Sequence, residues 1–490
     1  MFRTCTHPKM GSLSSDAPVH AVLFPFMSKG HTIPILHLAR LLLRRSLAAA
    51  VTVFTTPSNL PFVSRHLAGT PASAVSLPFP GGISGLPSGV ESTDALPSMS
   101  LFPAFASATA LLQPSLEAEL QRLHPQPTFM VSDGFLWWTL ESASKFGIPR
   151  LVFYGISNYA MVVSRAVAVE NHLRGPMAED EPFALNAFPW IKVTKNDFER
   201  HFSQPSTEDT PLLEFVMKTV VTMGKSNGLV VNSFKELEPA FLEYWNSECV
   251  PRAWCIGPLF PLERPVAHDP HVRTTWAEWL DRKQAGGERV LYAAFGSQAE
   301  MPAAQLREIA IGLERSGASF LWVVKSRESE IVADVDGGFK DRFEDRVRGR
   351  GMVVREWVDQ RDILMHESVH GFLSHCGWNS VLESMCAGVP ILAWPMMAEQ
   401  PLNARMVAEE IGVGLRVEAA DGTVRGFVSR EGLAKAVNEL MEGDRGEAVR
   451  KKVKEVAAMA RKAAEEGGSS WTALETLVEE ISGKREDPTG

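Results

Sequence analysis

Residues 357–400 read WVDQRDILMHESVHGFLSHCGWNSVLESMCAGVPILAWPMMAEQ, and they carry the strongest local evidence for the fold class of the chain. The apolar run 370–375 is typical of a buried strand, 379–387 has the pattern of a helix, and 389–394 is a second strand. Gly388 ends the helix, and a tight turn precedes it. The first N–H groups of such a helix are unpaired and its dipole favours an anion, so the stretch predicts a phosphate site in a parallel α/β sheet.

The composition indicates a globular protein with two domains. At 490 residues the chain exceeds what one core usually supports, so two domains of roughly 200 to 250 residues are expected. Hydrophobic residues make up 45% and charged residues 22%, and the net charge is −9. Without a dense Lys/Arg block, this balance argues against nucleic acid or an acidic membrane surface as the main partner. No run approaches the roughly 18 apolar residues of a membrane span.

The cysteines and the N-terminus indicate a cytoplasmic location. Five cysteines are scattered along the chain without a CxxC pair, which is typical of reduced thiols. Residues 1–18 contain no apolar segment of the kind found in signal peptides, so we expect them to form a polar tail.

The first half of the chain alternates strands and helices, which predicts a parallel sheet. Strands are expected at 19–24 and 128–132, and His31 and Asp133 follow them. Open α/β sheets bind ligands at this carboxyl edge. An imidazole and a carboxylate there suggest an acid–base pair in which the carboxylate orients the ring. Position alone leaves two alternatives open: a solvated cap residue for the histidine, and the N-cap of the next helix for the aspartate.

A second alternation of strands and helices follows the proline-rich segment 257–271, which we expect to be a linker. Its first strand, 289–295, ends just before Ser297. No G-x-G-x-x-G follows the first strand of the chain and no G-x-x-x-x-G-K-[ST] occurs, so a dinucleotide site is disfavoured and a P-loop is excluded. His370 and His375 would leave opposite faces of one strand, which argues against a metal site.

Residues 357–400 resemble the signature box of the plant family 1 UDP-dependent glycosyltransferases over its full length, from Trp-Val to the closing Glu-Gln. The resemblance continues through residues 30–31, 131–133 and 295–297. It implies an α/β protein of the GT-B fold, in which two Rossmann-like domains with parallel sheets face each other across a cleft. The N-terminal domain would hold the acceptor and the C-terminal domain the UDP-sugar.

The resemblance and the linker together predict how the chain is divided. The N-terminal domain is expected at 19–256, after the tail, and the C-terminal domain at 272–466, after the linker 257–271. Members of the family usually end with helices that cross back, so 467–490 is expected to form a helix packed on the N-terminal domain. We expect a monomer whose partners are the UDP-sugar and a small acceptor.

The resemblance also implies which residues hold the donor: Ser297, Trp357, Val358, Gln360, His375, Gly377, Trp378, Asn379, Ser380, Glu383, Glu399 and Gln400. Within this set Trp357 would stack on the uracil, Gln360 would lie near the ribose, and Glu383 would accept hydrogen bonds from the ribose hydroxyls. One departure from the family is Asp359, where proline is common, and we expect it to have little effect.

The remaining donor residues would bind the diphosphate and the sugar. The expected diphosphate ligands are Ser297, His375, Asn379 and Ser380. Trp378, Glu399 and Gln400 would face the sugar hydroxyls, and glutamine at the last position resembles members that use glucose. The hydrogen-bond donors among the diphosphate ligands would stabilise the charge on the departing UDP without a metal or another cofactor.

The implied activity is an inverting transfer of glucose from UDP-glucose to a small lipophilic acceptor such as a flavonoid or another phenol. His31, oriented by Asp133, would take the proton of the acceptor hydroxyl, and the product would be a β-glucoside. Since the base and the donor site come from different domains, domain closure is expected during turnover. The expected acceptor-binding residues are Phe26, Gly30, Phe135, Trp137 and Trp138.

Three alternatives to this activity stay open from the sequence. The first keeps the fold but uses another UDP-sugar, or transfers to nitrogen, sulfur or carbon. The second is an epimerase or hydrolase that acts on the UDP-sugar itself. The third is a silent sensor of sugar nucleotides, which would need neither His31 nor Asp133.

Overall fold

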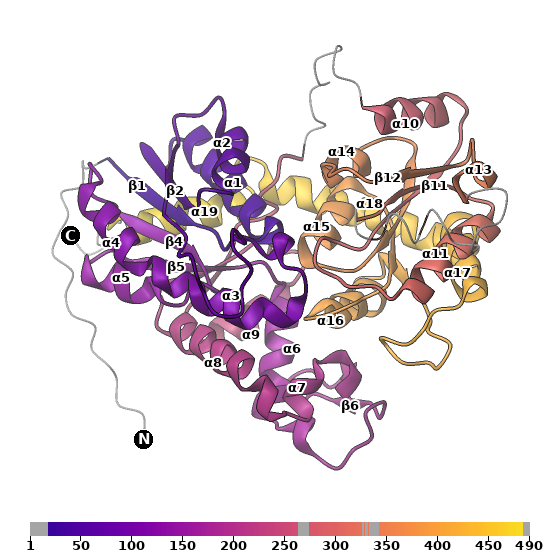
Figure 1. Ribbon diagram of the computed structural model, residues 1–490, viewed down its shortest axis with the longest axis horizontal. Coiled ribbons are helices and arrows are strands. Elements are labelled where there is room, and N and C mark those ends of the chain that lie inside the picture. The colour runs from indigo at the N-terminus through magenta and orange to yellow at the C-terminus, as the bar shows by residue number, and fades with distance from the viewer. Residues whose placement is uncertain (1–17, 263–273, 326–327, 329–331, 333–342, 484–490) are drawn as a thin grey trace.

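The computed structural model describes residues 18–262, 274–325, 328, 332 and 343–483, which form two α/β halves side by side (Figure 1). Each half contains one parallel sheet with helices packed against it, as the GT-B fold requires. The prediction of two Rossmann-like parallel sheets is therefore confirmed. Most of the predicted linker and nearly all of the predicted N-terminal tail lie outside the described residues.

The N-terminal sheet has seven parallel strands in the order β3-β2-β1-β4-β5-β8-β9. Their bounds are β1 His20–Phe24, β2 Ala50–Thr55, β3 Ser73–Ser76, β4 Phe129–Asp133, β5 Arg150–Tyr154, β8 Gly228–Val231 and β9 Ala253–Cys255. The helices are α1 Lys29–Arg44, α2 Leu60–Leu67, α3 Phe102–Ala108, α4 Gln113–Arg122, α5 Thr139–Lys145, α6 Asn158–Val169, α7 Arg200–Ser203, α8 Thr210–Gly224 and α9 Pro239–Glu248. A small antiparallel pair, β6 Phe183–Ala184 and β7 Lys192–Val193, lies between α6 and α7.

The C-terminal sheet has six parallel strands in the order β12-β11-β10-β13-β14-β15. Their bounds are β10 Val290–Ala294, β11 Ser319–Val323, β12 Gly351–Val354, β13 Val369–Ser374, β14 Ile391–Ala393 and β15 Gly414–Arg416. The helices are α10 Thr275–Ala285, α11 Ala303–Ser316, α13 Phe343–Arg346, α14 Gln360–Leu364, α15 Trp378–Ala387, α16 Gln400–Arg405, α17 Arg430–Glu442, α18 Asp444–Ala464 and α19 Ser469–Ile481. None of the described helices is long and apolar enough to cross a membrane.

Two helix starts differ from the sequence prediction, and both differences concern the site. Helix α1 begins at Lys29, so His31 lies inside its first turn instead of just before the helix. Helix α15 begins at Trp378, with Gly377 as its N-cap. Ser28 and Gly377 are the N-caps of these helices, and serine and glycine are both common at that position.

The last helix, α19, crosses back onto the N-terminal half, where it runs behind the sheet in Figure 1. Leu474, Leu477 and Val478 are buried in the same apolar cluster as strands β1 and β2. Arg45, the C-cap of α1, stacks on Trp471 at 3.6 Å from the ring centroid. The C-terminal segment therefore ties the two halves together.

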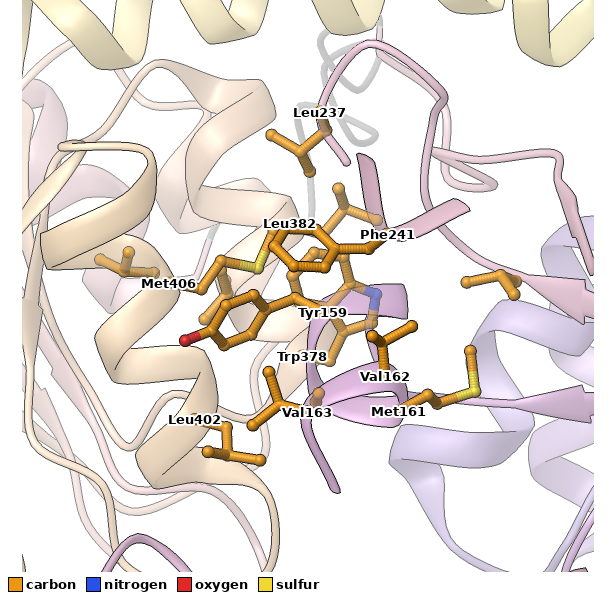
Figure 2. Packing of buried hydrophobic residues seen from close by; sticks show 14 of the residues in the cluster. Tyr159, Met161, Val162, Val163, Leu237, Phe241, Trp378, Leu382, Leu402 and Met406 are labelled. Carbon is orange, nitrogen blue, oxygen red and sulfur yellow. The ribbon is translucent and has the colours of Figure 1, made fainter. Parts of the chain in front are cut away.

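A second tie is an apolar core that runs directly between the halves (Figure 2). Tyr159 and Phe241 come from α6 and α9 of the N-terminal half, and they meet Trp378, Leu382 and Met406 from the other half. The rings of Tyr159 and Phe241 lie edge to face, 5.0 Å apart. Burial of these large side chains stabilises one fixed arrangement of the two sheets.

Candidate active site

The structure brings His31 and Asp133 together at the carboxyl ends of the neighbouring strands β1 and β4. His31 Nδ1 lies 2.7 Å from Asp133 Oδ2, and the aspartate is fully buried. The other carboxylate oxygen accepts a hydrogen bond of 2.9 Å from the N–H of Phe135. With both oxygens of Asp133 occupied, the imidazole has a fixed orientation, and no hydrogen bond of its Nε2 is seen among the described residues.

The surroundings of His31 raise its pKa. Burial lowers the pKa of the imidazole, but the charge and hydrogen bond of Asp133, with contributions from Glu399 and Asp94, raise it above its ordinary value overall. A base with a raised pKa accepts a proton more strongly, provided that the pH stays high enough to keep the ring neutral.

A cavity of about 610 Å³ lies between the carboxyl ends of the two sheets, and its wall includes Lys29 and Gly30 but neither His31 nor Asp133. The predicted donor residues in its wall are Ser297, Trp357, Val358, Gln360, His375, Asn379, Ser380 and Glu383. Gly30, predicted for the acceptor, also lines the cavity, and its carbonyl accepts a hydrogen bond from the amide of Asn379. The signature box and the start of α1 therefore face each other across one space.

His375 lines the cavity and lies against two glycines, Gly296 and Gly377. A Cβ added to Gly296 or Gly377 would lie 2.7 Å or 2.6 Å from His375 Nε2, so a larger residue at either position would collide with the ring. Burial, and then the charge of Lys325, lower the pKa of His375 to about 4, which keeps the ring neutral near pH 7. Its buried Nδ1 has no hydrogen-bond partner among the described residues.

Gln360 and Glu383 form the part of the wall nearest to Trp357. The Gln360 amide donates to Glu383 Oε2 at 2.7 Å and to Ser380 Oγ at 2.9 Å. Burial raises the pKa of the Glu383 carboxyl to about 7, and the hydrogen bond from Gln360 lowers it only in part. Asp359 caps helix α14 by accepting a hydrogen bond from the N–H of Arg361 at 3.1 Å, so this departure from the family serves the local backbone.

Trp357 is 52% exposed, which is unusual for a tryptophan and leaves much of its ring open to a planar ligand. The ammonium of Lys29 lies 5.6 Å from the centroid of the ring, and Phe62 packs edge to face against it at 6.0 Å.

The residues predicted for the sugar lie apart from the cavity wall. Trp378 is 1% exposed, belongs to the core between the halves, and donates from Nε1 to the carbonyl of Asn232 at 2.8 Å. Its indole therefore does not face the cavity, which corrects the expectation that it faces the sugar hydroxyls. The ring is large and apolar and is more stable in the core. Gln400 is buried, and its Oε1 accepts hydrogen bonds of 3.0 Å from the N–H groups of Met396 and Met397. Only its NH₂ group is left for a ligand.

An aromatic cluster packs against His31 on the side of the N-terminal half. Phe135 lies 4.9 Å and Phe26 lies 5.6 Å from the imidazole, measured between ring centroids. The cluster also contains Phe102 and Phe215, which the sequence reasoning missed because they lie on helices α3 and α8, far from any recognised motif.

The two tryptophans that were predicted to line the acceptor site belong to the same apolar cluster as Phe26 and Phe135. Trp138 is 1% exposed and donates to Thr109 Oγ1 at 3.2 Å, so it is a core residue of the N-terminal half. Trp137 has the ammonium of Lys218 5.0 Å from its ring centroid. The expectation for Trp138 is wrong in that its ring packs inward against Phe24.

The cavity is also lined by residues that no recognised sequence motif predicted. The amide of Gln298 donates to Ser28 Oγ at 2.9 Å and to Thr93 Oγ1 at 2.8 Å, which joins the two halves at the rim. Lys325, at the end of β11, adds a positive charge to the wall near His375. Gln298 directly follows the segment 295–297, so its position after a strand was the one feature of the sequence that could have indicated a place in the site.

The comparisons with known proteins agree with this arrangement. Residues 266–453 match the family model described as UDP-glucoronosyl and UDP-glucosyl transferase. UDP-glycosyltransferase 90A1 of Arabidopsis thaliana is 52% identical over 475 residues, which cover 95% of this chain and 97% of that protein.

Two solved structures have the same fold. Glycyrrhiza uralensis UGT73P12 complexed with glycyrrhetinic acid 3-O-monoglucuronide superposes with a TM-score of 0.82 at 30% identity, covering 96% of both chains. Phytolacca americana UGT2 complexed with UDP-2fluoro-glucose and pterostilbene gives 0.76 at 28% identity, covering 95% of this chain and 100% of that one. The chain thus belongs to the plant family 1 UDP-glycosyltransferases, enzymes of the hexosyltransferase type that move a sugar from a UDP-sugar to a small acceptor.

Proposed function

We propose that the protein is an inverting glucosyltransferase that moves glucose from UDP-glucose to the hydroxyl of a phenolic acceptor, forming a β-glucoside. The observation that carries the proposal is the His31–Asp133 pair, held at 2.7 Å, with Gly30 directly before His31 in the wall of the cavity of the signature box. A base on one side of the cleft and a diphosphate site on the other side suit attack in line with the departing UDP.

The donor is proposed to lie along the cavity, with its uracil on the open ring of Trp357 and its ribose at Glu383. The diphosphate would then reach the N-terminus of α15, where the side chains of Asn379 and Ser380 line the wall. Unpaired N–H groups at a helix N-terminus stabilise negative charge. We propose that these N–H groups and the side chains of Asn379 and Ser380, together with His375, stabilise the departing UDP without a metal ion.

The acceptor is proposed to bind against the aromatic cluster beside His31. Phe102 and Phe135 are only partly buried and offer apolar ring surface, which suits a flat, neutral ring system, while Phe26 is 1% exposed and packs edge to face against Phe135 at 5.3 Å. The similar Phytolacca americana structure contains pterostilbene, a phenolic compound, in agreement with this class. A hydroxyl on the ring nearest to His31 would become the nucleophile.

Replacement of His31 by alanine tests the proposal. We expect kcat to fall by about 10²-fold or more, because the acceptor hydroxyl loses its base. Calorimetric binding of UDP should be unchanged, since the donor site lies mainly in the other half. His366→Ala is the matched control, because it removes another histidine beside an aspartate, 3.3 Å from Asp281 and outside the cleft.

Normal turnover in the His31→Ala variant would refute the role of the base. The sugar is tested separately, by competition among UDP-glucose, UDP-galactose and UDP-glucuronate. Preferential use of UDP-galactose or UDP-glucuronate would correct the donor while leaving the base intact. Release of free sugar without an acceptor would instead indicate a hydrolase.

A further inference from the structure

Arg150 is a buried cation that belongs neither to the proposed donor site nor to the proposed acceptor site. It begins strand β5, is 1% exposed, and is among the largest fully buried side chains of the protein. Among the described residues no ion pair of the protein includes it, and its guanidinium donates only to uncharged oxygens. Burying a cation without a paired anion is costly, so its retention calls for a physical reason.

The contacts of Arg150 converge on the turn that carries Asp133. Its Nε donates to Ser132 Oγ at 2.7 Å and to Thr139 Oγ1 at 3.0 Å, the residues just before Asp133 and at the start of α5. One terminal nitrogen also donates to the backbone carbonyl of Asp133 at 3.4 Å. The guanidinium therefore joins both ends of the turn that aims the carboxylate at His31.

A fourth contact anchors the guanidinium from another segment. The other terminal nitrogen of Arg150 donates to Ser226 Oγ at 2.7 Å, and Ser226 itself donates to the carbonyl of Thr222 in helix α8. Since all three nitrogens have partners, on the turn of Asp133 and on the segment that follows α8, the planar group has one orientation only.

The charges around this group are few. Asp133 and Tyr154 are the ionisable groups that face Arg150. Burial lowers the pKa of Arg150 to about 10, so it is still a cation near pH 7. Burial raises the pKa of Tyr154, which stays neutral there. Asp133, Glu399 and Asp94 face His31. Asp133 is thus the carboxylate that faces both the guanidinium of Arg150 and the imidazole of His31.

We propose that Arg150 is a positioning residue for the catalytic pair: it holds the turn of Asp133 in place and balances the charge of that carboxylate, so that His31 rests as the neutral base. This inference depends on the proposed role of His31. Without the guanidinium the carboxylate would favour a protonated imidazole, and the acceptor hydroxyl would find no free base.

The test compares Arg150→Met and Arg150→Lys with wild-type enzyme, using UDP-glucose and a phenolic acceptor. In Arg150→Met we expect kcat to fall about tenfold or more and the acidic limb of the kcat profile to move to higher pH, with KM for UDP-glucose within about twofold. Lysine keeps the charge, so its acidic limb should stay near that of the wild type while kcat falls through looser positioning. Arg350→Met is the matched control, since among the described residues Arg350 likewise donates only to uncharged oxygens, the carbonyls of Leu313, Glu314 and Ala318 in the C-terminal half.

A folded Arg150→Met variant with the wild-type acidic limb and kcat would overturn the inference. So would a loss of thermal stability with no change in the profile, as expected of Arg350→Met. If Arg150→Met does not fold, Thr139→Val removes one contact of the guanidinium, and an unchanged kcat in it would equally overturn the inference. The His31→Ala variant separates the two proposals: if it still turns over, the proposed base is wrong, whereas its inactivity beside a normal Arg150→Met refutes only the role of Arg150.

Discussion

Glu383 is a residue of the cavity wall whose charge is expected to change near neutral pH. Its pKa is raised to about 7 by burial, so the carboxylate form is lost as the pH falls through that value. If Glu383 accepts hydrogen bonds from the ribose hydroxyls, KM for UDP-glucose should rise as the pH falls below 7. In Glu383→Gln we expect KM to be higher by about tenfold and independent of pH in this range, because a charge-assisted hydrogen bond is lost.

The same residue has a signature in stability. Its pKa in the folded protein exceeds the ordinary value of 4.5, so its contribution to stability is fully present below pH 4.5 and is lost as the pH rises through about 7. Glu383→Gln should therefore gain stability relative to wild type above pH 7, as measured by thermal unfolding without ligand. The exposed Glu442→Gln serves as the control, and equal pH profiles for both variants would contradict the assignment.

At the scale of residues, the sequence predicts positions better than it predicts the direction of side chains. His31 and Asp133 were predictable because each follows a strand, and neighbouring parallel strands end at one edge. The direction of the Trp378 side chain was not predictable, because a residue at the start of this helix can point either to the cavity or to the core between the halves. Its ring packs in the core between the halves, and no local pattern encodes a core made from two segments far apart in the chain.

Among the elements, helix α15 depends on the absence of a side chain at its N-cap. Gly377 has an ordinary φ of −59°, so alanine there is not strained in its backbone, yet its Cβ would lie 2.6 Å from His375 Nε2. We expect Gly377→Ala to move the imidazole, raise KM for UDP-glucose, and destabilise the protein by about 1–3 kcal/mol.

The matched control for this substitution is Gly286→Ala. A Cβ at Gly286 would meet no atom closer than 3.4 Å, at the exposed end of helix α10. Enzyme assays and thermal unfolding of the two variants separate a local collision from a general cost of replacing glycine. A normal KM in Gly377→Ala would show that the His375 ring can shift without loss of donor binding.

The prediction of elements succeeded where strands are apolar runs and failed where they are not. The continuous runs of β1 and β13 are typical of strands covered on both faces, and both were predictable. Strand β3 reads Ser-Ala-Val-Ser, is only partly buried, and lies at the edge of its sheet, so its sequence resembles a loop. Helices α3 and α8, which carry part of the aromatic cluster, were missed because they lie outside any recognised motif.

For the molecule as a whole, the core between the halves limits how the cleft can open. The resemblance suggested closure of two domains, but Tyr159, Phe241 and Trp378 already join them in one cluster on one side of the cleft. Large apolar interfaces oppose free motion of domains. Opening is therefore expected at the rim, where Gln298 makes two side-chain hydrogen bonds across the halves.

This division between core and rim predicts how the protein unfolds. Because the halves share a core, ligand-free protein should show one calorimetric transition. Tyr159→Ala removes a ring that is 1% exposed, so it should cost about 3–5 kcal/mol and separate the unfolding of the two halves into two transitions. Gln298→Ala should leave the single transition unchanged and raise KM for UDP-glucose, since only the rim is loosened. Two transitions in the wild-type protein would show that the shared core does not couple the halves, and the cleft would then be free to open as two rigid domains.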